Sequence, residues 1–225
     1  MRGKRYQQIT KLVDHKKAYS PAEAIELAAK TSGVKFDASV EVHARLGIDP
    51  TKGEQAVRGT VALPHGAGKT LRVAAFVGAA KETEAREAGA DLVGGEELIT
   101  EIAYSSKLNF DVAVATPDIM PRLAKIAKIL GPKGLMPNPK TDTVGNDVRK
   151  MVSELKKGKI AFKNDDSGNV HTAIGKVSFG PEKLLANFKA FMDVLRKSKP
   201  VTSKGLFLKG VSVSSSMGPG IKVSL

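Results

Sequence analysis

The clearest pattern in the chain is a strict alternation of apolar and polar residues between Val40 and Ile48. Every second residue in this stretch is apolar, and the intervening positions carry Glu41, His43 and Arg45. Successive side chains of a strand point to opposite faces, so the alternation predicts a strand with one buried side and one solvent-facing side. Sheets that keep one wet face are typically antiparallel, and we expect such a sheet here.

Patterns near both ends of the chain predict the other elements of this layer. Ser20 and Glu23 have the spacing of a capping box, and Pro21 suits the first position of a helix. A second helix has its apolar residues on one stripe, formed by Leu184, Leu185, Phe188, Phe191, Met192 and Leu195. The predicted elements are a helix over 20–33, strands over 57–63 and 206–218, a hairpin over 159–177 that turns at 166–168, and a helix over 181–199.

The middle of the chain follows a different pattern. Three short, almost uninterrupted apolar runs indicate strands that are buried on both faces, at 71–77, 90–93 and 111–115. Helical patterns separate and follow these runs, at 80–89, 96–105, 119–130 and 146–158. Strands alternating with helices predict a parallel, doubly wound sheet, so the fold class is α/β.

The change of pattern predicts a discontinuous module, residues 1–66 plus 159–225, interrupted by an α/β insert at 67–158. The net charge of +13 is divided unevenly between them. The insert has 14 basic and 12 acidic residues, which leaves the flanking module 22 of the chain's 36 Lys+Arg and 11 of its 23 Asp+Glu. Positive charge that served solubility alone would be spread over both parts, so the flanking module is expected to bind a polyanion, most often a nucleic acid.

Composition excludes several classes of protein. The chain has no cysteine, which rules out disulfides and thiolate zinc sites. No apolar run approaches the roughly 18 residues that a membrane span requires, so no membrane partner is expected. The N-terminus is basic but lacks the apolar region of a secretory signal, and we expect a cytoplasmic protein.

The segment Gly66–Thr70 resembles the end of a phosphate-binding loop. That loop needs a glycine five positions before Gly68, where this chain has Leu63, and Pro64 removes a backbone donor from the cradle. The loop must also open a helix, whereas the apolar run at 71–77 predicts a strand. We therefore interpret the segment as a crossing between the two modules.

Two chain crossings flanked by glycine predict a hinge between the modules. Gly66 and Gly68 tolerate backbone angles that other residues avoid, and Pro64 precedes them. Gly158 stands at the second crossing. The predicted hinge therefore consists of Pro64, Gly66, Gly68 and Gly158.

No arrangement of residues suggests catalysis. The four histidines are widely separated and none has a metal-binding spacing such as H-x-x-x-H. Neighbouring carboxylates, such as Glu96 and Glu97, do not share a helix face. We expect no catalytic residue, no metal and no cofactor. The alternative is a nucleotide-binding α/β enzyme that uses the insert, which nucleotide titration would reveal.

Seven segments of the chain resemble one family closely and in register. The family is that of large-subunit ribosomal protein one, the bacterial mobile-stalk proteins. The segments are FDASVEV (36–42), LGIDPTKGEQAVRGTVALPHGAGK (46–69), EAGADLVGGEEL (87–98), FDVAVATPDIMPRLAKI (110–126), ILGPKGLMPNPKTDTVG (129–145), KNDDSGNVHTAIGKVSF (163–179) and SSSMGPG (214–220).

This resemblance implies both architecture and function. It implies a two-layer α+β RNA-binding domain built from both chain ends, with an inserted Rossmann-like, three-layer α/β domain. It implies a non-enzymatic component of the large ribosomal subunit that is a monomer when free. The implied partners are large-subunit rRNA, exit-site tRNA, whose release it assists, and the mRNA of its own operon, whose translation it represses.

The resemblance also implies an RNA-binding site from two distant segments. The first is Lys35-Phe36-Asp37, with Ser39 and Glu41 nearby. The second is Ser216-Met217-Gly218, where serine replaces the threonine of the family's pattern and the hydroxyl is kept. The alternatives to an RNA-binding role are a core position for Phe36 and a frayed terminus for Met217.

Further basic residues are expected to support the site through salt-sensitive attraction to phosphates. Each of them has an alternative as an ordinary solvated side chain. They are Lys4, Arg5, Lys163, His171, Lys176 and Lys222.

Overall fold

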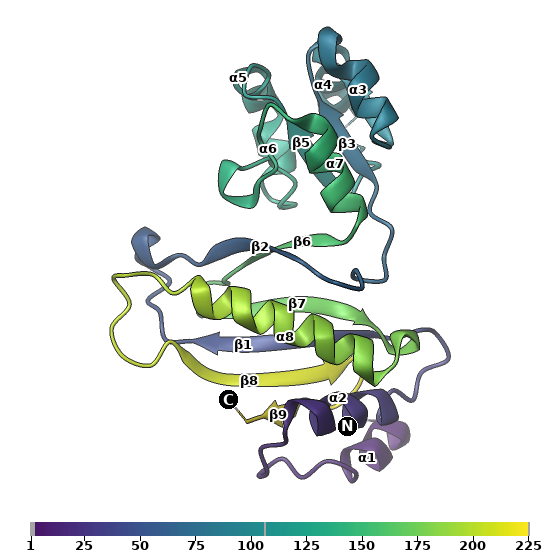
Figure 1. Cartoon of the computed structure of the whole chain (residues 1–225), viewed down its shortest axis with the longest axis vertical. Coiled ribbons are helices and arrows are strands. Elements are labelled where there is room, and N and C mark those ends of the chain that lie inside the picture. Colours follow the sequence, from purple (N-terminus) through teal and green to yellow (C-terminus); the bar gives the residue numbers. More distant parts are fainter. Residues whose placement is uncertain (1–2, 106, 225) are drawn as a thin grey trace. The chain divides into compact units, whose positions relative to one another are not determined.

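A computed structural model of the chain describes residues 3–105 and 107–224 (Figure 1). The chain divides into two compact units. Unit 1 consists of Met1–Gly68 and Ile160–Leu225, and unit 2 consists of Lys69–Lys159. Both ends of the chain therefore fold into the same unit.

The crossings between the units lie slightly later than the sequence pattern suggested. Ala67 packs against the core of unit 1, so the chain leaves this unit after Gly68. Lys159 donates hydrogen bonds to Glu154 at 2.8 Å and to Asp142 at 3.0 Å, which ties it to unit 2. These contacts, which apolar periodicity does not reveal, set the boundaries.

Unit 1 contains a four-stranded sheet in the order β7-β1-β8-β9 (Figure 1). Its strands are β1 (Ser39–Leu46), β7 (Asn169–Lys176), β8 (Leu208–Ser215) and β9 (Ile221–Val223). Strand β1 pairs antiparallel with both β7 and β8, so the N-terminal part of the chain lies between two C-terminal strands. The predicted alternation is confirmed: Val40, Val42 and Ala44 are fully buried, whereas the residues between them face the other side.

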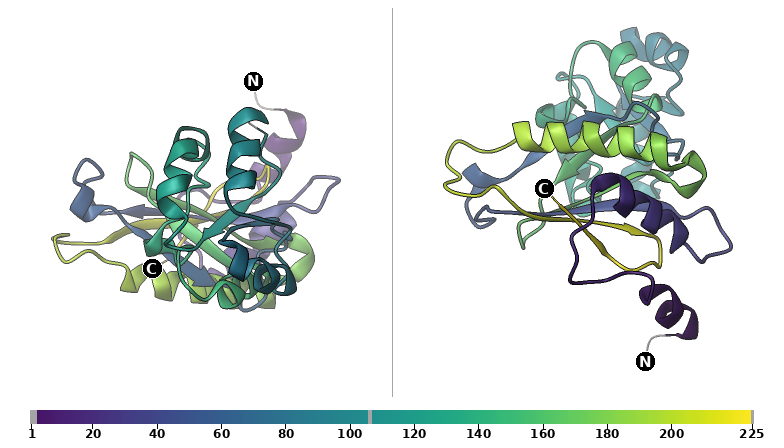
Figure 2. Two further views of the ribbon diagram at one scale, coloured as in Figure 1. Left: turned by 90° about the horizontal axis from the view of Figure 1, so that it is seen from above. Right: turned by 60° about the horizontal axis from the view of Figure 1, so that its bottom comes forward.

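Helices α2 (Pro21–Lys30) and α8 (Pro181–Lys197) pack side by side on the buried face of this sheet (Figure 2). The capping box of α2 is confirmed, because Ser20 and Glu23 exchange hydrogen bonds of 3.1 and 3.4 Å. The apolar stripe of α8 fills the same core. The opposite face of the sheet carries polar side chains. Helix α1 (Lys4–Thr10) and strand β9 had not been predicted.

The predicted hairpin over 159–177 is wrong. Strand β6 (Lys159–Lys163) pairs with β2 (Arg58–Ala62) in a separate two-stranded sheet, and only one bridge, between Asn164 and Val170, joins the supposed hairpin arms. Asn164 exchanges two hydrogen bonds with the backbone of Val57, which directs the chain toward β2.

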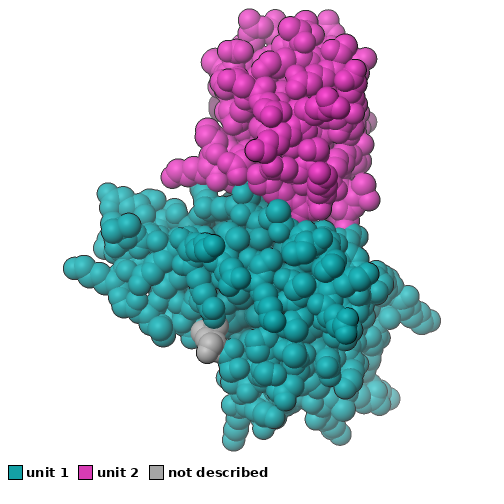
Figure 3. Space-filling view, in the orientation of Figure 1, with its two compact units in different colours: residues 1–68, 160–225 teal, residues 69–159 magenta. Residues whose placement is uncertain are grey.

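Unit 2 is the α/β part of the chain, coloured magenta in Figure 3. Its parallel sheet has the order β4-β3-β5, with β3 (Val73–Phe76), β4 (Leu92–Gly94) and β5 (Val112–Ala115). All four residues of β3 are buried, as an uninterrupted apolar run predicts for a strand covered on both faces. The α/β fold class is thereby confirmed.

Helices cover both faces of the parallel sheet, which makes unit 2 a three-layer structure. Helices α3 (Glu82–Glu87) and α7 (Val148–Lys156) share one core with Val73 and Ala75. The other face packs against α4 (Glu96–Ser105), α5 (Met120–Leu123) and α6 (Ala127–Leu130). The last two replace the single helix predicted over 119–130, because the 3-10 turn Ala124–Ile126 lies between them.

The remaining 3-10 helices are single turns at Gly53–Gln55, Ala79–Lys81, Pro139–Thr141 and Val177–Phe179. Among residues 3–105 and 107–224, no helix has the length and apolar composition that crossing a bilayer requires.

Candidate nucleic-acid interface

The two segments expected to form one site meet where β1 begins and β8 ends. The backbone N–H of Ser39 donates to Ser216 Oγ at 3.2 Å, and the N–H of Ser216 donates to the carbonyl oxygen of Ser39 at 2.9 Å. Glu41 lies next to this point, opposite Ser214 on β8. Antiparallel pairing thus brings together residues that are far apart in the sequence.

Met217 and Phe36 both present apolar side chains to solvent at this place. Met217 is 69% exposed and Phe36 is 59% exposed, so a core position for Phe36 is excluded. Met217 has a left-handed backbone with φ of 61°, and the N–H of Gly218 closes the turn on the carbonyl of Ser215 at 2.8 Å. Met217 therefore lies in an ordered turn and does not belong to a frayed end.

Lys176 joins the same surface from the end of β7. Its Nζ donates to Ser39 Oγ at 2.9 Å and to the carbonyl oxygen of Asp37 at 3.4 Å. Asp37 in turn accepts two hydrogen bonds from Ser178, one from the backbone N–H at 3.2 Å and one from the hydroxyl at 2.7 Å. We call the resulting group the Met217 surface: Lys35, Phe36, Ser39, Glu41, Lys176, Ser216, Met217 and Gly218.

Helix α1 borders the Met217 surface. The Arg5 guanidinium donates to the carbonyl oxygen of Gly33 at 2.9 Å and to that of Met217 at 3.5 Å. A cavity of about 410 Å³ lies here, lined by Gly3, Arg5, Tyr6 and Met217. The sequence had suggested phosphate contacts for Arg5, but in this structure its guanidinium has two backbone carbonyls as partners.

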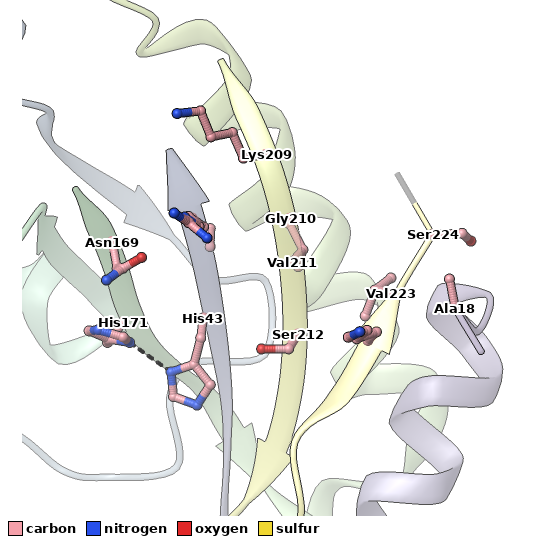
Figure 4. A pocket seen from close by; sticks show the side chains of 13 residues that line it. Ala18, His43, Asn169, His171, Lys209, Gly210, Val211, Ser212, Val223 and Ser224 are labelled. Carbon is pink, nitrogen blue, oxygen red and sulfur yellow. Dashed lines mark hydrogen bonds between the residues drawn. The ribbon is translucent and has the colours of Figure 1, made fainter. Parts of the chain in front are cut away.

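A second polar region occupies the open face of the four-stranded sheet (Figure 4). It surrounds a cavity of about 580 Å³, and none of the described residues that line it is acidic, although Asp165 lies 3.4 Å from Nε2 of the lining residue His171. The polar and charged side chains on this open sheet face are those of His43, Arg45, Asn169, His171, Lys209, Ser212 and Lys222. Anions are the expected ligands of such a basic, polar surface.

Several of these residues were not identified as site residues from the sequence. His43 and Arg45 occupy solvent-facing positions of the alternating pattern in β1, and this is the signal that could have identified them. Lys209, the second residue of β8, gave no such signal, and Tyr6 lies on a helix that had not been predicted.

The expected supporting residues do not form one cluster. Lys222 and His171 lie on the open sheet face, whereas Lys176 belongs to the Met217 surface. Lys163 ends β6, next to the bridge at the start of β7, while Lys176 ends β7. The six residue steps from the bridge partner Val170 to Lys176 span roughly 20 Å, which separates Lys163 from the Met217 surface.

The sequence model of the Ribosomal protein L1p/L10e family matches residues 27–219. The chain belongs to this family. The match covers most of the chain, including all of unit 2 and both segments of the Met217 surface. Membership makes the chain a ribosomal protein of the large subunit. Helix α1, which carries Arg5, lies outside the matched residues.

A histidine pair forms the centre of the open sheet face in this L1p/L10e family member. The Nδ1 atoms of His43 and His171 are 2.8 Å apart, and His43 Nε2 lies 2.9 Å from Ser214 Oγ. A hydrogen bond between the two Nδ1 atoms needs one donor and one acceptor, so at least one ring nitrogen stays unprotonated. Burial, followed by the charge of neighbouring His171, lowers the pKa of His43, although Glu41 opposes the shift.

This pair predicts a loss of stability on acidification. The folded-state pKa of His43 lies below its ordinary 6.5, so the unfolded chain binds more protons as the pH falls through that window. The free energy of unfolding should therefore fall below about pH 6.5. We expect His43→Gln to reduce this pH-dependent change by about 0.5 kcal/mol, the scale of a partly exposed charge pair. Urea unfolding of both proteins between about pH 7.5 and 5.5 measures the difference; parallel curves would contradict the assignment.

The glycine-rich segment at 66–70 does not have the structure of a phosphate-binding loop. Lys69 Nζ donates to Asp111 at 2.8 Å, and the backbone N–H of Arg72 donates to the same carboxylate at 3.1 Å. These bonds, the Lys69 bond foremost, lower the pKa of Asp111 to about 2. The chain continues into strand β3 instead of opening a helix, so the would-be phosphate-binding lysine serves as an ion-pair partner.

The glycines of the predicted hinge have backbone angles that favour glycine. Their φ values are 68° at Gly66, 74° at Gly68 and 102° at Gly158. Next to Pro64, however, Asn187 of α8 holds the chain in place: its side-chain oxygen accepts from the backbone N–H of His65 at 3.1 Å, and its side-chain nitrogen donates to the carbonyl oxygen of Gly66 at 2.9 Å. The hinge itself stays a prediction.

In the part of the chain that the structure describes, no three His, Cys, Asp or Glu side chains gather in an arrangement that could hold a metal ion.

Proposed function

We propose that this protein binds large-subunit rRNA through the Met217 surface and the open sheet face of unit 1. The observation that supports the proposal is the convergence of Ser39 and Ser216, because each has an exposed apolar residue close by in the sequence, Phe36 and Met217, and Lys176 donates to Ser39 Oγ. Most of the excess positive charge of the chain lies in the sequence segments that form this unit.

The chemistry of the Met217 surface suits structured RNA. Ser39 and Ser216 offer hydroxyls, and the turn at Gly218 leaves its backbone close to the surface, where 2′-hydroxyls and base edges are within reach of hydrogen bonds. Phe36 and Met217 offer apolar area for unstacked bases or riboses. On the open sheet face, Arg45, Lys209 and Lys222 supply attraction to phosphates, which holds the RNA without reading its sequence. We infer a binding role without catalysis.

Two further roles belong to the same proposal. A surface that recognises the shape of an rRNA element also binds an mRNA that folds into a similar shape, so the protein represses its own operon when rRNA is scarce. The third RNA partner is exit-site tRNA, whose release the protein assists while it is held on rRNA. Both roles are supported by the close resemblance of the chain to the bacterial mobile-stalk proteins.

Filter binding of the full-length protein to an rRNA stem-loop fragment tests the proposal. About three phosphate contacts predict a logarithmic salt slope near −2.5, or about 30-fold weaker binding at 200 mM than at 50 mM salt. Photocrosslinking in the same samples should label unit 1. The leader of the operon mRNA should compete for the same site, and tRNA should bind the preformed complex. Crosslinks confined to unit 2 would contradict the assignment of the rRNA surface.

A further inference from the structure

We propose that Arg5 is a positioning residue that holds the Met217 turn in the conformation that binds RNA; this inference rests on the function proposed above. The guanidinium of Arg5 lies between two backbone carbonyls from segments that are remote in the sequence, those of Gly33 and Met217. It thereby connects α1, the loop before β1 and the turn after β8.

The Met217 turn has a physical need for such support. Met217 has a φ of 61°, a left-handed conformation that side chains with a Cβ rarely adopt, yet its side chain is 69% exposed and packs little. Burial therefore does little to hold the turn. The hydrogen bonds on its backbone hold it instead, namely those between Ser216 and Ser39, that from Gly218 to Ser215, and that from Arg5.

Arginine suits this place better than lysine does. Its planar guanidinium presents several N–H donors in fixed directions, so that one side chain can serve two carbonyls at once. The aliphatic part of Arg5 also lies against Gly33, since a Cβ built there would be 3.7 Å from Arg5 Cδ. A phosphate contact, by contrast, needs positive charge and is made by lysine as well as by arginine.

The test compares three variants of the full-length protein in the rRNA titration across salt. Arg5→Gln and Arg5→Lys should each weaken binding roughly fivefold to tenfold, as expected for loss of a charge-assisted hydrogen bond, with the salt slope unchanged. Lys4→Gln is the matched control, because Lys4 is an exposed cation on the same helix. Its loss should change affinity only through salt-sensitive attraction. Thermal unfolding checks that each variant is folded.

A double-variant cycle adds a second readout. If Arg5 acts by placing the Met217 turn, then Arg5→Gln combined with Met217→Ala should weaken binding by less than the product of the two single effects. Two outcomes would show a phosphate contact and overturn the positioning role. One is wild-type affinity in Arg5→Lys, and the other is a salt slope that becomes shallower by about 0.7–0.9 in Arg5→Gln. If the wild-type protein itself does not bind the fragment, the proposed function fails, and that outcome is distinct from either of these.

Discussion

Gly47→Ala should lower the free energy of unfolding of unit 1 by about 3 kcal/mol, from steric overlap and weakened hydrogen bonds together. Gly47 follows β1, and a Cβ at this position would collide with the backbone carbonyl oxygen of Leu206. This overlap is relieved only if the loop that carries Leu206 moves away from Gly47. That movement would strain two hydrogen bonds, from the Gly47 N–H to Phe207 at 2.6 Å and from Ser203 Oγ to the Gly47 carbonyl at 3.1 Å.

Gly53→Ala provides the matched control for this prediction. Gly53 is an exposed glycine at the start of the 3-10 turn Gly53–Gln55, and apart from its chain neighbours no atom lies within 4 Å of a Cβ built on it. We expect its stability to stay within about 0.5 kcal/mol of the wild type. Urea unfolding followed by circular dichroism measures both variants. Equal urea midpoints for the two would show that the loop that carries Leu206 moves away from the added methyl group without loss of stability.

Met217→Ala should weaken binding of the rRNA fragment by about 1–3 kcal/mol, the scale of one lost base contact. The side chain of Met217 is largely solvent-exposed in the free protein, so its removal should leave stability nearly unchanged. The loss should persist at high salt, because an apolar contact releases no counterions. Filter binding at two salt concentrations measures the effect.

Val201→Ala is a suitable control, since Val201 is fully exposed in a loop before β8 and lies outside the Met217 surface. This variant should bind RNA as the wild type does. A Met217→Ala protein that binds with wild-type affinity would remove Met217 from the interface and leave only the hydroxyls and basic residues of the proposal.

Local features of the chain were predictable because their causes are local. The alternation from Val40 onward, the Ser20–Glu23 capping box and the apolar stripe of α8 each depend on residues a few positions apart, and all three are confirmed. The buried strands of unit 2 follow from short apolar runs in the same way.

Predictions failed where distant partners decide the structure. The 159–177 hairpin has the expected turn, with Asp165 accepting hydrogen bonds from Ser167 and Asn169, yet β6 pairs with β2. The turn itself does not determine that choice, because the neighbouring Asn164 bonds to the backbone of Val57, which is distant in the sequence. Helix α1 was missed because none of its residues is buried, so it lacks an apolar stripe.

The sequence alone determined the kinds of elements, the interruption of one module by another, the basic excess and the segments that resemble one ribosomal family. Only the tertiary structure decided that Ser39 meets Ser216, that His43 meets His171, and that Arg5 reaches the Met217 carbonyl. The physical reason is that periodicity and capping act over a few residues, whereas backbone hydrogen-bonding groups are chemically alike along the chain. Which of them pair depends on how the whole core packs.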